Sequence, residues 1–421
     1  MFTKEEALTY IQENDVKFIK LFFTDIFGAI KSISIQPSEM ERAFETGINF
    51  DASAVKGVLN ITKSDLFIVP DPATLCVLPW RPQTGRVVRF FCNVRYIDGT
   101  PFEGDPRALL KNEVKKAYGQ GYEIRIGTEC EFYLFKLDEK GEPTLVPHDH
   151  AGYCDLAPRD RGENVRRDIC LTLEQMGVHP EASHHEAGPG QNEVDFRWSE
   201  PVSAADNLAT FKIVVKTIAD RYGLFASFMA KPMGDQAGSG LHIGISLWKD
   251  GKNLFAGELC EEAKQFMAGI MHRVREITAF LNPYPNSYER FGAFEAPRYI
   301  SWSRENLGQL IRVPAATSQD ARLELRSPDP SCNQYLAIYL VLAAGFEGIE
   351  QKRVLPPATD ADLYNASAEE TKGLEILPLT QKEAVSLALK SDFVKAKLSQ
   401  RTIDAFEEAE ESAKKAEFTE I

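Results

Sequence analysis

The sequence lacks the marks of a membrane or secreted protein. Its longest apolar run, Tyr335 to Phe346, is shorter than the roughly 20 residues that cross a bilayer, and it is typical of a buried helix. The first residues contain a helix capping box, in which Thr3 and Glu6 satisfy free helix N–H groups, instead of a basic segment followed by an apolar one. We therefore expect a cytoplasmic protein that does not enter a membrane.

Paired cysteines and an excess of basic residues are also missing. The 7 cysteines are scattered without a C-x-x-C pair, which argues against a zinc knuckle and a disulfide framework. The chain contains 62 Asp and Glu residues and 48 Lys and Arg residues, which gives a net charge of −14. Nucleic acid is thus an unfavourable partner, because phosphate binding needs a basic surface, whereas metal ions or cationic small molecules fit better.

The chain has enough apolar residues to form a large hydrophobic core, and its length favours two domains. Of 421 residues, 43% are hydrophobic, which favours two domains over one. The segments Val16–Phe23 and Ala29–Ile35 predict a β-hairpin near the N-terminus. Turn-forming residues concentrate at Asp98–Arg107 and end the strand-like pattern. We expect a small domain over residues 1–98 and a larger one over 99–421.

The larger part alternates strand-like and helical patterns. Apolar, β-rich segments occur at Tyr122–Leu134 and Gly240–Trp248. They alternate with helical patterns at 204–222, 260–281 and 333–350. This arrangement predicts an α+β fold in which an antiparallel sheet is backed by helices.

Carboxylates lie within several of these apolar strands. Glu129 and Glu131 are two residues apart, so both point to one face of a strand. A single acid pair of this kind is more often a solvent-facing edge. Together, however, five carboxylates and one imidazole make a cation site plausible, because carboxylates buried without a cation would repel one another. Ligands that are mostly oxygen atoms suit Mg²⁺ or Mn²⁺ more than Zn²⁺. The candidate ligands are Glu129, Glu131, Glu186, Glu193, His242 and Glu324.

Four arginines accompany these carboxylates. The four are Arg290, Arg312, Arg322 and Arg326, although any one of them could be a surface residue. Guanidinium groups pair bidentately with carboxylates and phosphates. Metal ions and arginines together indicate an anionic substrate that undergoes phosphoryl chemistry.

The order of the motifs resembles that of type I glutamine synthetases over nearly the whole chain. So many ordered matches are far more specific than any single motif. The matching segments are Phe50-Asp51-Ala52-Ser53, Glu129-Cys130-Glu131, Ala151-Gly152-Tyr153, Glu181-Ala182-Ser183-His184-His185-Glu186, Gln191-Asn192-Glu193, Gly238-Ser239-Gly240-Leu241-His242, Asn286-Ser287-Tyr288, Phe294-Glu295-Ala296-Pro297 and Glu324-Leu325-Arg326-Ser327-Pro328-Asp329-Pro330.

The resemblance implies a fold, a reaction and its cofactors. The fold would be a β-grasp-like N-terminal domain followed by a catalytic domain with a curved antiparallel sheet backed by helices. The reaction would join ammonia to the γ-carboxylate of L-glutamate through γ-glutamyl phosphate, with ATP and at least two Mg²⁺ or Mn²⁺ ions per active site. One metal would be held by Glu131, Glu186 and Glu193, and the other by Glu129, His242 and Glu324.

Further roles follow from the resemblance position by position. Arg290 and Arg326 would bind the carboxylates of glutamate, and Gly238 would approach its amino group through the backbone. Arg312 and Arg322 would contact phosphate.

Three further residues, Glu181, Trp198 and Ser246, match nucleotide-binding positions of the family. Trp198 could instead belong to the core, because a large aromatic side chain often does.

An ammonium pocket is implied between two subunits. Asp51 of a neighbouring subunit, Tyr153 and Glu295, which lies on a flap, would bind ammonium and take up its proton. The family forms homo-oligomers with such shared sites, so we expect a hexameric ring. A dodecamer of two rings is the weaker expectation, because relatives continue into a segment that clasps the rings. Tyr364 matches a position that is adenylylated in some relatives, although an ordinary surface tyrosine is the simpler interpretation.

The sequence departs from the family near the expected site. Leu307 stands where the family has a phosphate-binding arginine, a contact worth about 1.5–3 kcal/mol unless Arg298 or Arg304 replaces it. The segment Arg290–Glu295 is one residue shorter than usual, and Ala54 replaces a serine.

Three functions stay open from the sequence. Glutamine synthesis is favoured by the retained Asp51, Tyr153 and Glu295. A γ-glutamyl ligase acting on another amine is an alternative, against which Glu295 argues. A weakly active or inactive relative with a regulatory or structural role is the third, and Leu307 is its only support.

Overall fold

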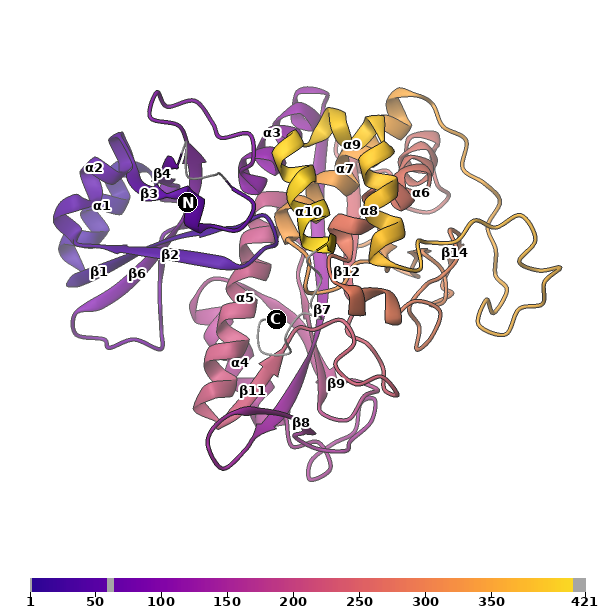
Figure 1. The fold of residues 1–421 in the computed structure, drawn as a ribbon, viewed down its shortest axis with the longest axis horizontal. Coiled ribbons are helices and arrows are strands. Elements are labelled where there is room, and N and C mark those ends of the chain that lie inside the picture. The colour runs from indigo at the N-terminus through magenta and orange to yellow at the C-terminus, as the bar shows by residue number, and fades with distance from the viewer. Residues whose placement is uncertain (1, 59–63, 412–421) are drawn as a thin grey trace.

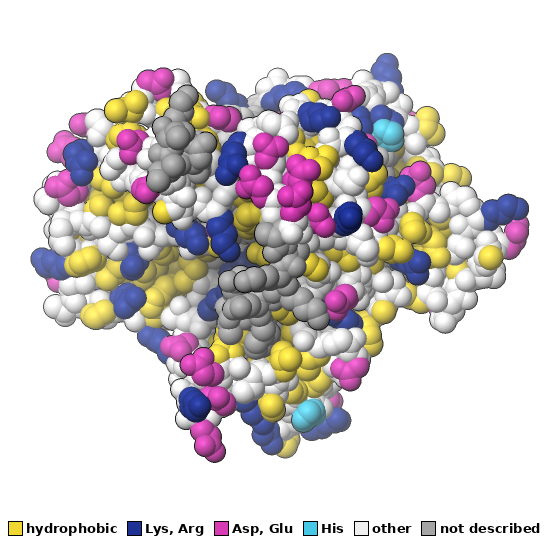
Figure 2. All heavy atoms as spheres, in the orientation of Figure 1, with side chains coloured by type: hydrophobic (Ala, Val, Ile, Leu, Met, Phe, Trp, Pro, Cys, Tyr) yellow, Lys and Arg dark blue, Asp and Glu magenta, His cyan; other side chains and the backbone are white. Residues whose placement is uncertain are grey.

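The chain folds around two β-sheets, each with its own hydrophobic core. The computed structural model describes residues 2–58 and 64–411. In Figure 1 the smaller, N-terminal sheet lies on the left, and the larger sheet runs through the centre with helices around it. On the face shown in Figure 2, basic and acidic side chains are interspersed, and acidic ones gather over the last helix, α10.

The small sheet contains the predicted hairpin. Its strands run in the order β2-β1-β6-β4-β3, with β5 paired to β6, and β1 and β6 are parallel. The antiparallel pairing of β1 with β2 confirms the hairpin. The elements are α1 (Lys4–Glu13), β1 (Val16–Thr24), β2 (Ile30–Ile35), η1 (Pro37–Glu39), α2 (Met40–Glu45), β3 (Ile48–Asp51), η2 (Ala52–Ala54), β4 (Asp65–Pro70), η3 (Pro72–Thr74), β5 (Cys76–Val77) and β6 (Arg86–Arg95).

The first helix of this part begins where the sequence predicts. Thr3 Oγ1 accepts a hydrogen bond from the Glu6 N–H, and the Glu6 carboxylate accepts one from the Thr3 N–H, so the capping box is formed.

The large sheet is built around the long strand β7. Among the described residues the sheet has ten strands, β7 included. Seven of them run in the order β14-β15-β16-β12-β7-β10-β9, while β11 and β8 also pair with β7, and β13 pairs with β12. The antiparallel arrangement predicted from the sequence is present except between β14 and β15, which are parallel. The strands are β7 (Tyr122–Leu137), β8 (Pro143–Pro147), β9 (Pro180–His185), β10 (Gln191–Phe196), β11 (Leu224–Ser227), β12 (Leu241–Lys249), β13 (Lys252–Asn253), β14 (Trp302–Arg304), β15 (Ile311–Val313) and β16 (Leu323–Leu325).

Helices cover the large sheet and complete its core. The helical patterns predicted at 204–222, 260–281 and 333–350 correspond to α5, α6 and α7. The apolar run of the sequence lies in α7, whose side chains are buried almost throughout. The helices are α3 (Pro106–Gly119), α4 (Glu163–Gln175), α5 (Pro201–Arg221), α6 (Glu261–Leu281), η4 (Pro285–Glu289), α7 (Gln334–Glu350), α8 (Gln381–Lys390), α9 (Asp392–Lys397) and α10 (Gln400–Glu411). None of these described helices is long and apolar enough to span a membrane.

A buried arginine ties the small sheet to the large one. Arg107, at the start of α3, donates to Asp71 Oδ2 (3.1 Å) and Asn93 Oδ1 (2.9 Å) of the small sheet and to Asp206 Oδ2 (2.9 Å) of α5. Asn333 adds a bond from its side chain to the Asp25 carbonyl (2.9 Å). Because a buried charge without partners is costly, these contacts favour one fixed arrangement of the two parts.

Candidate active site

Strand register brings the predicted metal ligands to one face of the large sheet. Glu131 in β7 lies opposite Glu193 in β10, and Glu129 lies opposite His242 in β12. Strand β16 pairs with the other side of β12 and supplies Glu324. Residues two apart on a strand share a face, so these ligands meet across four neighbouring strands, β16, β12, β7 and β10.

These side chains line a cleft of about 590 Å³. Glu324 lies behind the cleft and is only 1% exposed. The predicted residues that line it are Glu129, Glu131, Tyr153, Glu186, Glu193, Gly238, His242, Arg290, Glu295, Arg312 and Arg326. Residues from nine separate segments of the sequence thus converge on one site.

Glu129, His242 and Glu324 form the first group of potential cation ligands. Their ligand atoms lie within 4.8 Å of one another. His242 Nδ1 is 3.2 Å from Glu129 Oε2 and 3.5 Å from Glu324 Oε1. Arg312 Nη1 donates to Glu324 Oε2 (3.0 Å), and Arg326 donates to Glu324 Oε1. Two carboxylates and an imidazole in this arrangement fit a divalent cation.

The second cluster contains a residue that the sequence analysis did not select. His184 joins Glu186 and Glu193, with ligand atoms again within 4.8 Å, and His184 Nε2 is 3.1 Å from Glu186 Oε1. The Glu131 carboxylate instead accepts hydrogen bonds from Gln191 Nε2 (2.7 Å) and the Gly240 N–H (3.1 Å). The alternation rule applied to β9 would have found His184, since it is two residues before Glu186.

Asp195 is a second residue that sequence reasoning missed. It lines the same cleft and follows Glu193 by two residues along β10, so the two carboxylates share a face of the strand.

Crowded carboxylates resist ionisation in this cleft. Burial, together with the charge of Glu186, raises the pKa of Glu131 to about 7. Burial and the charge of Glu131 raise the pKa of Glu193 well above its usual range. A divalent cation would favour the ionised form of both groups, so the residues present fit a metal centre.

Two arginines in the cleft are ion-paired with Glu324. The side chains of Arg312 and Arg326 line the cleft, and each donates to the Glu324 carboxylate. Arg290, by contrast, donates to the carbonyls of Ser327 and Arg326 (both 2.9 Å), so backbone contacts hold its guanidinium. Guanidinium groups that line a cleft beside a cluster of potential cation ligands can bind the oxygens of an anionic substrate.

Gly238 allows the backbone to pass close to this arginine. A Cβ atom at Gly238 would lie 2.6 Å from the Ala230 carbonyl oxygen and 2.7 Å from Cγ of Arg290. A larger residue would therefore displace the guanidinium or the loop, which explains the glycine by close approach.

The flap that carries Glu295 has an unusual backbone. Phe294 and Glu295 both adopt positive φ angles, 48° and 64°, which non-glycine residues rarely do. Lys231 Nζ lies 4.7 Å from the centre of the Phe294 ring, and Tyr364 Oη donates to the Ala296 carbonyl (3.3 Å). The one-residue shortening predicted from the sequence falls in this segment, and Tyr364 contacts the flap.

The predicted nucleotide-binding residues Glu181, Trp198 and Ser246 are not among the residues that line the cleft. Trp198 is 51% exposed, so the alternative that it belongs to the core is wrong. Its indole stacks on the Arg125 guanidinium, 4.0 Å from the ring centre. Ser246 lies opposite Arg125 in the sheet, and Glu181 is exposed on β9.

Arg322 lies beside the group formed by Glu129, His242 and Glu324. Its Nη2 lies 3.7 Å from Glu129 Oε1.

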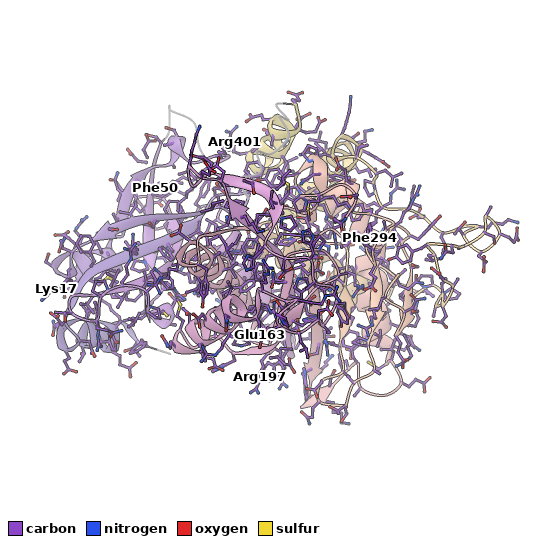
Figure 3. The ribbon with its side chains drawn as sticks, turned by 90° about the horizontal axis from the view of Figure 1, so that it is seen from below. Lys17, Phe50, Glu163, Arg197, Phe294 and Arg401 are labelled. Atoms are coloured by element: carbon purple, nitrogen blue, oxygen red, sulfur yellow. The ribbon has the colours of Figure 1, made fainter. Side chains whose placement is uncertain are left out.

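Asp51 does not reach the cleft of its own chain. It ends β3 and accepts hydrogen bonds from the Ser53 N–H (3.0 Å) and hydroxyl (2.6 Å). Figure 3 shows Phe50, its neighbour in sequence, well separated from Phe294 on the flap. Within one chain, therefore, Asp51 and Glu295 cannot act on the same molecule.

Leu307 lines the cleft at the position where an arginine is expected. Arg304 donates to the Gly257 carbonyl (3.0 Å), and Arg298 packs beside Gly292. Neither arginine is among the residues that line the cleft, so the described residues offer no substitute from this segment.

Comparisons with known proteins match almost the whole chain. Residues 103–421 match the family model described as glutamine synthetase, catalytic domain, and residues 15–96 match that of the glutamine synthetase beta-grasp domain. A glutamine synthetase of Clostridium saccharobutylicum is 45% identical over 405 residues, covering 94% of this chain and 91% of the relative. One from Methanosarcina mazei is 46% identical over 412 residues, covering 96% and 92%.

Solved structures share the fold. A GmaS/ADP complex superposes with a TM-score of 0.87 at 30% identity, covering 96% of this chain and 95% of that one. The glutamine synthetase of Plasmodium falciparum superposes with a TM-score of 0.86 at 22% identity, covering 98% and 96%.

Proposed function

The chain belongs to the glutamine synthetase family, and on this premise we propose that it joins ammonia to the γ-carboxylate of L-glutamate with ATP, forming glutamine. The observation that carries the proposal is the cleft itself. It brings two groups of potential cation ligands together with the guanidinium groups of Arg290, Arg312 and Arg326. Such a site suits an anionic substrate that is phosphorylated.

Divalent cations are proposed for both ligand groups. Glu129, His242 and Glu324 would hold one ion, and Glu131, Glu186 and Glu193 the other, with Mg²⁺ or Mn²⁺ as the metal. When bound, the ions would neutralise the terminal phosphates of ATP and stabilise the charge that develops during transfer. The raised pKa values of Glu131 and Glu193 support this assignment, because a nearby cation would be needed to keep both ionised.

In the first step the glutamate γ-carboxylate attacks the terminal phosphorus of ATP, and ADP leaves. Arg290 and Arg326 would hold the carboxylates of glutamate, and Gly238 would contact its amino group through the backbone. Arg312 and Arg322 would stabilise the transferring phosphoryl group. The product, γ-glutamyl phosphate, has a far better leaving group than the free acid, so one hard displacement becomes two easier ones.

We propose that the nucleotide base and ribose lie beyond the cleft. Glu181, Trp198 and Ser246 would bind them, and the exposure of Trp198 supports this role.

In the second step ammonia attacks the γ-carbonyl carbon, and phosphate leaves with one former glutamate oxygen. Ammonium would bind to Asp51 of a neighbouring subunit, with Tyr153 and Glu295, and would lose a proton to a carboxylate before attack. Glu295 on the flap would also exclude water from the acyl phosphate.

The proposed function requires a homo-oligomer with active sites between subunits. The separation of Asp51 from the cleft of its own chain supports a shared site. A hexameric ring in the cytoplasm is proposed, with residues 1–98 as the β-grasp domain and 99–421 as the catalytic domain.

The experiment that tests the function measures phosphate release and product identity together. The protein is incubated with ATP, Mg²⁺ and glutamate, and ammonium is compared with a panel of primary amines and polyamines. Glutamine formation that accounts for the phosphate released supports the proposal. A γ-glutamyl amide formed in preference from an amine would replace it with the related ligase, and no ammonium- or amine-dependent release would point to an inactive relative.

Leu307 yields a prediction about ATP. Replacing Leu307 with arginine should raise kcat/KM for ATP by about tenfold, because a charged contact to phosphate contributes about 1.5–3 kcal/mol and part of this is lost to side-chain ordering. Leu307→Met is the matched control that keeps the size without the charge. Unchanged kinetics in Leu307→Arg would mean that another residue already supplies the contact.

A further inference from the structure

A third cluster of titratable groups, separate from the two groups in the cleft, lies behind the hairpin that joins β9 to β10. It contains Asp149, Asp160 and His185, whose potential ligand atoms lie within 4.8 Å of one another. Asp160 is already paired with Arg166 and accepts from the Gly162 N–H (2.9 Å). Because its acceptors are occupied by N–H donors, this cluster has the properties of a scaffold more than of a cation site.

Asp149 collects donors from four places in the chain. Its Oδ1 accepts from His185 Nε2 (2.9 Å), the Gly190 N–H (3.0 Å) and the Ala151 N–H (3.3 Å). Its Oδ2 accepts from the Arg161 N–H (2.9 Å). Burial opposes its ionisation, but the hydrogen bonds from His185 and Arg161 outweigh this and hold the pKa of Asp149 well below its usual range. An ionised carboxylate offers acceptors only, which matches four donors.

His185 extends this network to the cation ligands. Its Nε2 faces Asp149, and its Nδ1 lies 2.7 Å from the Glu186 carbonyl oxygen. The ring therefore bridges the Asp149 carboxylate and the main chain of Glu186. The peptide of Glu186 is thereby fixed from behind the cleft.

The segments that meet at Asp149 are those that enter the active site. From Ala151 the chain leads to Tyr153, whose ring stacks edge-on against His184 at 5.2 Å. From Gly190 it leads to Gln191, which donates to Glu131, and then to Glu193. The Cys154 N–H also bonds to the His185 carbonyl (3.0 Å), so the Tyr153 loop and the hairpin are already neighbours.

We infer that Asp149, through His185, is a positioning residue that sets the Tyr153 loop and the Glu186–Glu193 hairpin in one arrangement. The inference rests on the proposed function for the roles of Tyr153, Glu186 and Glu193. Partners that orient metal ligands from behind typically contribute 10- to 100-fold in metal affinity. The loss of Asp149 should therefore be felt at the cation site and at the Tyr153 pocket together.

The test uses Asp149→Asn, which keeps the size of the side chain but turns an acceptor into an amide donor. Mn²⁺ affinity of the full-length protein is measured by titration, and hydrogen exchange is followed at residues 186–192. Asp206→Asn is the matched control, because Asp206 is also buried and bonds to Arg107 and Tyr335 away from the cleft. Both variants lose a buried carboxylate, so both should melt at lower temperature.

We expect Asp149→Asn to lose at least tenfold in Mn²⁺ affinity and to raise KM for ammonium, while Asp206→Asn binds Mn²⁺ like the parent. Parental Mn²⁺ affinity in a folded Asp149→Asn protein would overturn the inference. If Asp149→Asn does not fold, His185→Gln is measured instead. It keeps one donor toward Asp149 but loses the second ring nitrogen, which faces the Glu186 carbonyl, so it must also weaken Mn²⁺ binding. Metal affinity is read without turnover, so this outcome is independent of whether the protein makes glutamine.

Discussion

Alanine at Glu193 or Glu131 should reduce ligase activity by more than about 100-fold, because the metal ions contribute several kcal/mol of transition-state stabilisation and each substitution removes a charge from the ligand groups. The loss should appear as weaker Mn²⁺ or Mg²⁺ binding in a titration as well as lower turnover. Glu142→Gln, which removes an exposed carboxylate from the turn after β7, is the control and should match the parent.

Replacing Glu193 with glutamine should not destabilise the metal-free protein. The pKa of Glu193 is raised by burial and by Glu131, so its ionised form destabilises the fold at every pH above the unfolded value of about 4.3. Glu193→Gln keeps the volume and removes this repulsion. At pH 8 with a chelator it should melt at least as high as the parent. A lower melting temperature would mean that Glu193 is structural, and unchanged metal affinity would contradict its assignment as a ligand.

The local part of this cleft could be predicted from the sequence because strand periodicity is local. Glu129 and Glu131 share a face of β7 as expected, and the helix capping box at Thr3 is present. The same rule would have identified His184 and Asp195. What alternation alone does not give is the pairing of β7 with β10 on one side and β12 on the other, since both contacts join segments far apart in the chain.

Other features depend on the folded backbone itself. The role of Asp149 rests on N–H groups from distant segments, which no residue pattern reports. The exposure of Trp198 likewise depends on where the chain turns after β10. The segment Arg290–Glu295 is one residue shorter than in the family, but this difference alone does not predict the positive φ angles of Phe294 and Glu295.

The Asp51→Asn variant should be nearly inactive with ammonium but should still bind glutamate and ATP. Asparagine keeps the size of Asp51 and removes the charge that binds ammonium and accepts its proton. Glutamine formation should therefore fall far more than nucleotide binding, which is measured by titration with ADP. Equal losses in both would indicate a structural defect.

Mixing this variant with Glu324→Ala tests whether the site is shared. Each variant alone lacks one half of every site, yet random co-assembly places an intact Asp51 beside an intact Glu324 at about a quarter of the interfaces in a ring with head-to-tail contacts. Dissociation and joint reassembly should therefore restore part of the parental activity. If verified mixed rings stay inactive, Asp51 does not serve a neighbouring subunit.

The proposed reaction requires that the γ-carboxylate of glutamate be activated by phosphoryl transfer before ammonia attacks. Glutamate labelled with ¹⁸O in the γ-carboxylate tests it most directly, with ATP, Mg²⁺ and ammonium, and with mass spectrometry of the phosphate released. Each phosphate should carry one ¹⁸O atom, and labelled phosphate and glutamine should form in equal amounts. Glutamine accompanied by unlabelled phosphate, or phosphate released without glutamine, would contradict it.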